Sequence, residues 1–208
     1  MKSSSIFFLT FLSVLGFTNC AKETVSVDSW IDSNRHEKVL NLSKKEIGTL
    51  PSKIGELTSV EELTLQYDSL TFIPVEMGRL TSLRILNLFG NPISSLPDSL
   101  GDLQNLEVLL LGRTDLTTVP SFLPKLQKLK TLALDETKIE LTEADVEILA
   151  QIPNLKTLDL TLLRNFKKLP KNISKLSFLN EIFLQKIAFE KSDVARLRDE
   201  LPKVRVKL

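Results

Sequence analysis

Residues 83–103 read LRILNLFGNPISSLPDSLGDL, and this stretch decides the fold of the 208-residue chain. Its first half places Leu83, Leu86 and Leu88 in the spacing L-x-x-L-x-L, which alternates like a β-strand with one buried face. A turn follows, and the Leu96-Pro97 segment then brings further apolar side chains back towards the same core. One such stretch therefore encodes one strand and one return segment.

The same pattern recurs seven or eight times between Glu37 and Leu208. Its fourth position falls, in order, at Leu40, Leu63, Leu86, Leu109, Leu132, Leu158, Ile182 and Val206. The separations between these residues are 23, 23, 23, 23, 26, 24 and 24. A single unit of this size cannot bury its apolar face alone, so neighbouring units must stack into a solenoid. We predict an α/β repeat solenoid over residues 37–208, with a concave parallel sheet of about eight short strands.

The convex side is predicted to be mostly irregular or 3-10 helical, with two short helices. Thr142 and Asp145 form a capping pattern for a helix running to about Ala150. Ser192 is expected to cap a second helix that runs through Leu201. Residues 20–36 have little repeat character and are predicted to form a tether and an N-terminal cap.

These repeats resemble the leucine-rich repeat family, in its 23-residue form with the pattern L-P-x-x-I-G-x-L. The resemblance covers residues 37–208. It implies a polar ladder in the turns, in a slot held here by Asp68, Asn91, Thr114 and Thr137 but by apolar Leu163 and Ile187 in later units. It also implies that a protein ligand binds to the concave sheet, through the strand positions that are not leucine.

Read in that register, the concave face presents large apolar groups beside an arginine and an acidic flank. The ligand-binding candidates are Tyr67, Ile85, Phe89, Val108, Leu110, Arg113, Asp135, Glu136, Asp159 and Phe183. Apolar groups ringed by polar ones have the composition of an interaction hot spot, and the acids can steer a basic partner. The alternative is that these positions tolerate any residue, with Tyr67 and Phe89 merely packing on each other.

The first 19 residues read as an export signal, with Lys2 followed by an apolar run from Ile6 to Phe17 that is too short to span a bilayer. Cys20 is the only cysteine and follows Phe17-Thr18-Asn19, which resembles the lipidation motif of bacterial lipoproteins, in its looser spirochaete form. This resemblance implies a lipid on Cys20 and a place in the bacterial envelope, at the outer membrane or cell surface or facing the periplasm. The alternative is an ordinary signal peptide with an incidental cysteine.

Charge and composition limit the other functions. Residues 37–161 carry 12 basic and 18 acidic side chains, whereas residues 162–208 carry 12 basic and 5 acidic ones. The basic third offers a second hypothesis, binding of anionic polysaccharide or a membrane surface, through Arg164, Lys167, Lys168, Lys171 and Lys175. A periplasmic scaffold is a further alternative.

Catalysis is not expected, because His36 is the only histidine and the sequence contains none of the usual catalytic motifs. A pair of carboxylates, Asp135 and Asp159, on adjacent strands would lie on an open, wet surface, which is unfavourable for raising a pKa. We expect no cofactor, no metal and no nucleic-acid partner, and a monomeric protein.

Overall fold

The structure, a computed structural model, describes residues 26–208 except residues 164 and 167. The predicted signal segment 1–19 and Cys20 lie outside the described residues. The elements, in chain order, are α1 (Val27–Ser33), β1 (Val39–Asn41), η1 (Ser52–Glu56), β2 (Glu62–Thr64), η2 (Val75–Arg79), β3 (Ile85–Asn87), η3 (Asp98–Asp102), β4 (Val108–Leu110), η4 (Leu123–Lys125), β5 (Thr131–Ala133), α2 (Glu143–Ala150), β6 (Thr157–Asp159), η5 (Ile173–Leu176), β7 (Glu181–Phe183), α3 (Lys191–Glu200) and β8 (Arg205–Lys207).

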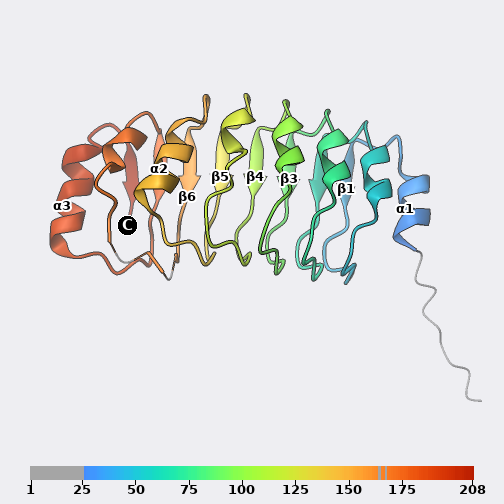
Figure 1. Cartoon of the computed structure of the whole chain (residues 1–208), viewed down its shortest axis with the longest axis horizontal. Coiled ribbons are helices and arrows are strands. Elements are labelled where there is room, and N and C mark those ends of the chain that lie inside the picture. The colour runs from blue at the N-terminus through green and yellow to red at the C-terminus, as the bar shows by residue number, and fades with distance from the viewer. Residues whose placement is uncertain (1–25, 164, 167) are drawn as a thin grey trace, which may run out of the picture.

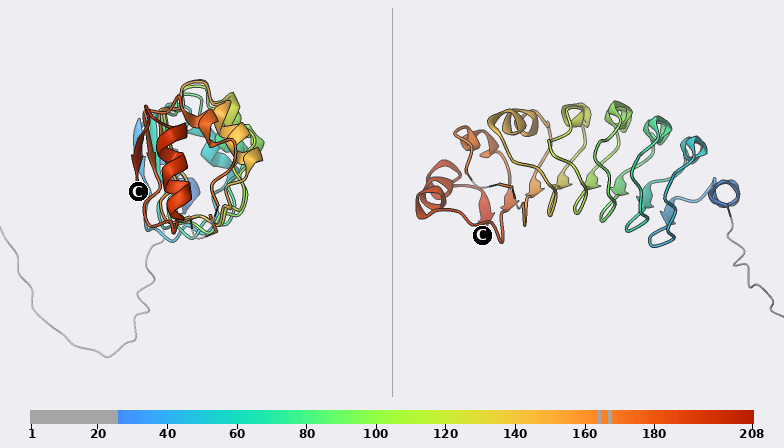
Figure 2. Two further views of the ribbon diagram at one scale, coloured as in Figure 1. Left: turned by 90° about the vertical axis from the view of Figure 1, so that its left-hand side faces the viewer. Right: turned by 60° about the horizontal axis from the view of Figure 1, so that its bottom comes forward.

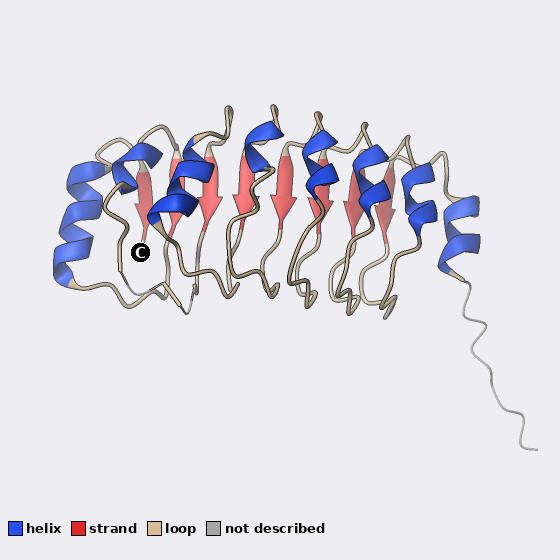
Figure 3. Cartoon of the chain, viewed as in Figure 1, coloured by secondary structure: helices blue, strands red, loops and turns tan. Residues whose placement is uncertain are grey.

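The strands β1 to β8 form one parallel sheet in the order of the chain (Figure 1). Equivalent repeat positions pair across the sheet, so Leu63 lies beside Leu86 and Leu86 beside Leu109. The helices form a separate layer on the other side of the core (Figure 3). When the arc is turned, the strands lie on its inner side and the helices spread along its outer side (Figure 2). The predicted α/β solenoid with eight short parallel strands is confirmed.

The core consists of the repeated apolar positions. In the second unit every predicted core side chain is completely buried, namely Val60, Leu63, Leu65, Leu70, Ile73, Met77 and Leu80. The return segments of the first three units begin with an extended proline and continue as the 3-10 helices η1, η2 and η3. These helices are wider than a strand, whose neighbours lie about 4.8 Å apart, so their stacking curves the sheet inward.

A polar ladder fills the turns, as the resemblance implied. Asn91, which is fully buried, donates its amide to the carbonyls of Leu65 (2.6 Å) and Leu88 (2.8 Å). Its Oδ1 accepts from the amides of Asp68 and Leu70, both at 3.0 Å. In two later units the slot holds apolar side chains that join the core instead: Leu163 is buried, and Ile187 packs against the core.

The two predicted convex helices are present as α2 and α3. Thr142 and Asp145 make the predicted capping box at the start of α2. The predicted cap of α3 is wrong: the helix begins at Lys191 after Glu190, and Ser192 lies inside its first turn. The Ser192 hydroxyl donates to Glu190 Oε2 at 3.5 Å, and the N-cap residue Glu190 makes no side-chain capping bond.

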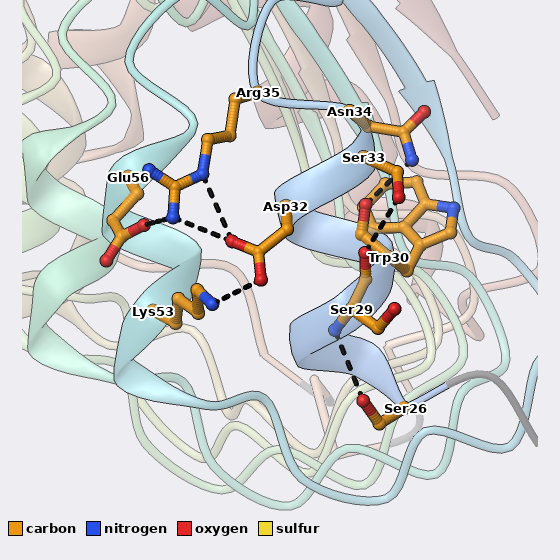
Figure 4. A network of polar contacts seen from close by, with 9 residues as sticks. All are labelled: Ser26, Ser29, Trp30, Asp32, Ser33, Asn34, Arg35, Lys53 and Glu56. Atoms are coloured by element: carbon orange, nitrogen blue, oxygen red, sulfur yellow. Dashed lines mark hydrogen bonds and ion pairs between the residues drawn. The ribbon is translucent and has the colours of Figure 1, made fainter.

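Helix α1 covers the convex layer of the first repeat, and its Ile31 is completely buried. Ion pairs fix it to η1: Asp32 contacts Lys53 at 2.7 Å, and Arg35 bridges Asp32 (2.7 Å) and Glu56 (2.5 Å) (Figure 4). The helix thus shields apolar surface that the first repeat would otherwise expose.

Candidate functional site

The strand register brings the apolar candidates of the concave face together. Ile85 on β3 lies beside Val108 on β4, and Leu110 follows one pleat further along β4. Phe89 follows β3, and Tyr67 follows β2. We call these five residues the apolar cluster. None of them is buried in the core, so the predicted orientation towards the concave face is present in the structure.

The two aromatic rings of the cluster pack on each other and still contact solvent. The ring centroids of Tyr67 and Phe89 lie 5.5 Å apart, with the planes at 77°. Such an edge-to-face arrangement is a favoured one for aromatic pairs. Tyr67 nevertheless keeps 40% of its surface exposed. The rings therefore stabilise each other without becoming part of the interior.

Gly90 and Gly112 lie beneath these rings, and neither was among the predicted site residues. The Gly90 amide donates to the Gly112 carbonyl at 2.9 Å. A β-carbon on Gly90 would lie 2.5 Å from two carbons of the Tyr67 ring, and one on Gly112 would lie 2.7 Å from Phe89. Only glycine allows the rings to lie this close to the backbone. The available signal was a glycine at a strand end where other repeats carry a side chain.

The residues at the Tyr67 position adopt the left-handed backbone conformation in successive repeats. Its φ is 55° at Tyr67, 75° at Gly90, 53° at Arg113 and 55° at Glu136. This conformation costs residues other than glycine roughly 1–2 kcal/mol. It is a property of the repeated turn, and it projects these side chains along one edge of the sheet.

Side chains of this edge hold Tyr67 in place. Arg113 Nη1 donates to the Tyr67 hydroxyl at 3.4 Å, across the space above Gly90. Arg113 Nε also contacts Glu136 Oε2 at 3.2 Å. On the other side, Lys44 Nζ lies 5.8 Å from the centre of the Tyr67 ring, within the range of a cation–π contact. Lys44 was not among the predicted ligand-binding residues.

The predicted acidic flank lies directly beside the cluster. Burial and, to a lesser extent, the nearby Asp159 together raise the pKa of Asp135 to about 6, and Arg113 opposes the shift. The expectation that this open surface leaves the carboxyl pKa unraised is therefore wrong for Asp135, because its side chain is partly buried. A β-carbon on Gly112 would lie 2.3 Å from Asp135 Oδ1 and 2.7 Å from a ring carbon of Phe89. The carboxylate and the aromatic ring thus meet over the same glycine. Asp159 Oδ1 accepts from the Thr161 amide at 2.9 Å.

Phe183 is an apolar candidate that the structure does not bring to the apolar cluster. It lies on the same pleat as Leu110 but on β7, with Ala133 and Asp159 between them. Three strand spacings of about 4.8 Å separate the two backbones by about 14 Å. Phe183 does lie directly beside Asp159, its register partner on β6, so it borders the acidic flank on the side away from the apolar cluster.

The basic set of the C-terminal third is partly neutralised. Two of its members, Arg164 and Lys167, lie outside the described residues. Of the others, Lys175 contacts Glu147 at 2.6 Å. Lys168 and Lys171 border a pocket of about 200 Å³ whose wall includes Glu143. Among the described members of this set, the charge of Lys175 is therefore compensated by an ion pair.

Within residues 26–208, gaps excepted, no group of three or more His, Cys, Asp and Glu side chains is arranged to hold a metal ion. His36 is exposed at the N-terminal end of the solenoid.

Searches with this chain gave structural matches only: no family model and no curated protein matches it. A leucine-rich repeat protein of Leptospira interrogans matches with a TM-score of 0.54 and 22% identity, over 86% of this chain and 56% of that protein. The leucine-rich repeat domain of the type III effector XopL matches with a TM-score of 0.67 and 20% identity, over 84% of this chain and 69% of that domain. The chain has the leucine-rich repeat fold.

A third similar structure is the plant peptide hormone receptor RGFR1 in complex with RGF2. It matches with a TM-score of 0.56 and 23% identity, over 81% of this chain but only 27% of the receptor chain. The present chain thus spans about half of the Leptospira protein and about a quarter of the receptor.

Proposed function

We propose that this protein is a monomeric, non-catalytic binding module whose concave sheet holds a protein ligand. The observation that carries the proposal is the apolar cluster: aromatic and aliphatic side chains that remain accessible on an open sheet. Aromatic residues with an arginine beside them are enriched in the hot spots of protein interfaces. Lys44, Arg113 and the acidic flank supply the polar rim that such hot spots usually have.

The similar structures support this proposal through their fold. One of them is the plant peptide hormone receptor RGFR1 in complex with RGF2. At 23% identity this likeness concerns the fold, and the ligand of the present chain is inferred from its own concave side chains.

The proposal is tested by selecting ligands from a random peptide library displayed on phage, with the purified protein as bait. The double variant Phe89→Ser, Leu110→Ser should lose the selected peptides. The matched control is Phe72→Ser, Val75→Ser, because these two apolar side chains are 54% and 57% exposed outside the concave strands. We expect the control to retain binding. Equal loss in both variants, or no selected peptide that distinguishes the cluster variant, would refute the proposed site.

We further propose that residues 1–19 direct export and that Cys20 carries a lipid anchor in the bacterial envelope. Two or more acyl chains give stable anchoring, at about 0.8 kcal/mol per buried methylene. Within the described residues, no helix has the length and apolar character needed to cross a membrane. An anchor at the cell surface favours a host ligand, whereas a periplasm-facing anchor favours a scaffold role. The variant Cys20→Ser should move the protein from the membrane fraction to the soluble fraction. If the variant still partitions with the membranes into detergent, lipidation of Cys20 is disproved.

Binding of polysaccharide or membranes through the basic third is the less supported alternative, since Lys175 is already paired with Glu147. Retention on a heparin column that survives the change of Lys168 and Lys171 to Glu would exclude this site.

A further inference from the structure

The apolar cluster and the acidic flank form one continuous surface. Phe89 and Asp135 approach each other over Gly112, which contributes no side chain between them. The Asp135 carboxylate therefore lies near the Phe89 ring, in a partly buried position. Asp159 lies on the next strand, β6, and its backbone carbonyl accepts from the amide of Leu134, the neighbour of Asp135.

Neither of these two aspartates makes an ion pair within the part of the chain that the structure describes. Other acids on the same face do: Glu136 contacts Arg113 at 3.2 Å, and Glu181 contacts Arg205 at 3.6 Å. Arg113 is directed to Glu136 and to the Tyr67 hydroxyl. Two neighbouring negative charges beside an apolar surface thus remain available to a cation from outside.

Charge is distributed unevenly around the cluster. Lys44 and Arg113 lie on the Tyr67 side, and Asp135 and Asp159 lie on the side of β5 and β6. A ligand with one positive side chain is favoured in one orientation and repelled in the reverse one. The charge distribution therefore favours one orientation of a bound ligand.

Building on the proposed function, we infer that the ligand is a polypeptide segment with an apolar side chain on the apolar cluster and a lysine or arginine between Asp135 and Asp159. Binding of the cation pairs the partly buried Asp135 carboxylate with a positive charge beside an apolar contact, where charges interact more strongly than in bulk water. The raised pKa of Asp135, about 6, is consistent with a carboxylate that lacks a cation partner in the free protein.

The sheet also sets the spacing of the two ligand residues. The apolar cluster is centred on β3 and β4, whereas Asp135 follows β5 and Asp159 is the last residue of β6. The two centres therefore lie about two strand spacings, or about 10 Å, apart. An extended chain advances about 3.3 Å per residue. The apolar and the basic residue of an extended ligand should therefore be separated by about three positions.

The test compares peptide selections with the intact protein and three variants, using a random peptide library displayed on phage. The variant Asp135→Asn, Asp159→Asn removes both charges and keeps an oxygen that can accept from the Thr161 amide. Asp98→Asn, Asp102→Asn makes the same charge change on exposed residues of η3 and serves as the control. The cluster variant Phe89→Ser, Leu110→Ser reports on the proposed function itself.

Peptides selected by the intact protein should combine an apolar residue with Lys or Arg about three positions away. Their affinity for the Asp135→Asn, Asp159→Asn variant should fall about tenfold or more, while the η3 control should bind within about twofold of the intact protein. Selected peptides that require the cluster but show no basic preference, or that bind the aspartate variant equally well, overturn this inference and leave the proposed function standing. Selection that is unaffected by the cluster variant overturns both.

Discussion

Replacing Asp68 by Asn should stabilise the protein, because Asp68 occupies an asparagine position of the turn ladder. Asp68 is fully buried, and its Oδ1 accepts from the Lys45 amide at 2.6 Å. Its Oδ2 has no hydrogen-bond partner among the described residues. One repeat later, Asn91 uses the corresponding amide group to donate to two backbone carbonyls. A carboxylate cannot make these two bonds.

The magnitude follows from this comparison. Each new hydrogen bond contributes a net of about 1 kcal/mol, and an unpaired buried acceptor costs about 1–3 kcal/mol. We expect Asp68→Asn to raise the free energy of unfolding by about 2–3 kcal/mol at pH 7. For a domain of this size that corresponds to an increase in Tm of about 5–10 °C.

The gain should depend on pH in a defined direction. Burial raises the pKa of Asp68 above its ordinary value of 3.8, so the folded state binds this proton more tightly than the unfolded state. The penalty of Asp68 is therefore small below about pH 4 and grows as the pH rises towards the raised pKa. The stability difference between the variant and the original protein should be largest at neutral pH and shrink at acidic pH.

The assay is urea unfolding followed by circular dichroism at pH 3.5 and pH 7, with Asp98→Asn, an exposed aspartate, as the control. Unfolding should be followed by a second spectroscopic probe as well, because repeat arrays can unfold in parts and the two transitions must then be compared. An Asp68→Asn protein that is no more stable than the original at pH 7, or a gain that does not change with pH, would refute the reasoning.

Three further outcomes are expected. Gly90→Ala should cost about 1–2 kcal/mol for its left-handed φ, and it should displace the Tyr67 ring, measured as a changed tyrosine fluorescence and weaker binding of selected peptides. Asp135→Asn should stabilise the protein by about 1–2 kcal/mol at pH 7, discounted because the carboxyl is partly exposed. Since the folded pKa is about 6 against 3.8, this gain should disappear in urea titrations below about pH 4. Thr142→Ala should remove the capping box and cost about 1 kcal/mol, detected as a lower urea midpoint.

The fold could be predicted from the sequence because every repeat has apolar side chains to bury at the same positions. Each unit places leucines at the same offsets, and a parallel register pairs equal offsets, so residues such as Leu63 and Leu86 had to become neighbours. The capping box of Thr142 was also visible, since it depends on two residues three positions apart. The start of α3 was not, because Ser192 is a good capping residue but the N-cap is Glu190, two residues earlier.

The candidate site was predicted in its members but not in its internal contacts. The register alone placed Tyr67, Phe89 and Leu110 on the concave face. It could not show that Asp135 contacts the same glycine as Phe89, because that contact depends on side-chain directions across two strands. Nor could it separate Phe183 from the cluster without counting strands along the sheet.

The two glycines explain why large side chains gather at this part of the sheet and at no equivalent place nearby. Phe89 and Gly112 occupy the same repeat position on neighbouring units, and so do Gly90 and Arg113. In the third unit a large side chain is therefore followed by a glycine, and in the fourth unit a glycine is followed by a large side chain. Phe89 extends over Gly112, while Tyr67 and Arg113 meet above Gly90. The backbone is the same in each repeat. The two glycines at staggered positions therefore leave the room that an aromatic surface with a charged edge requires.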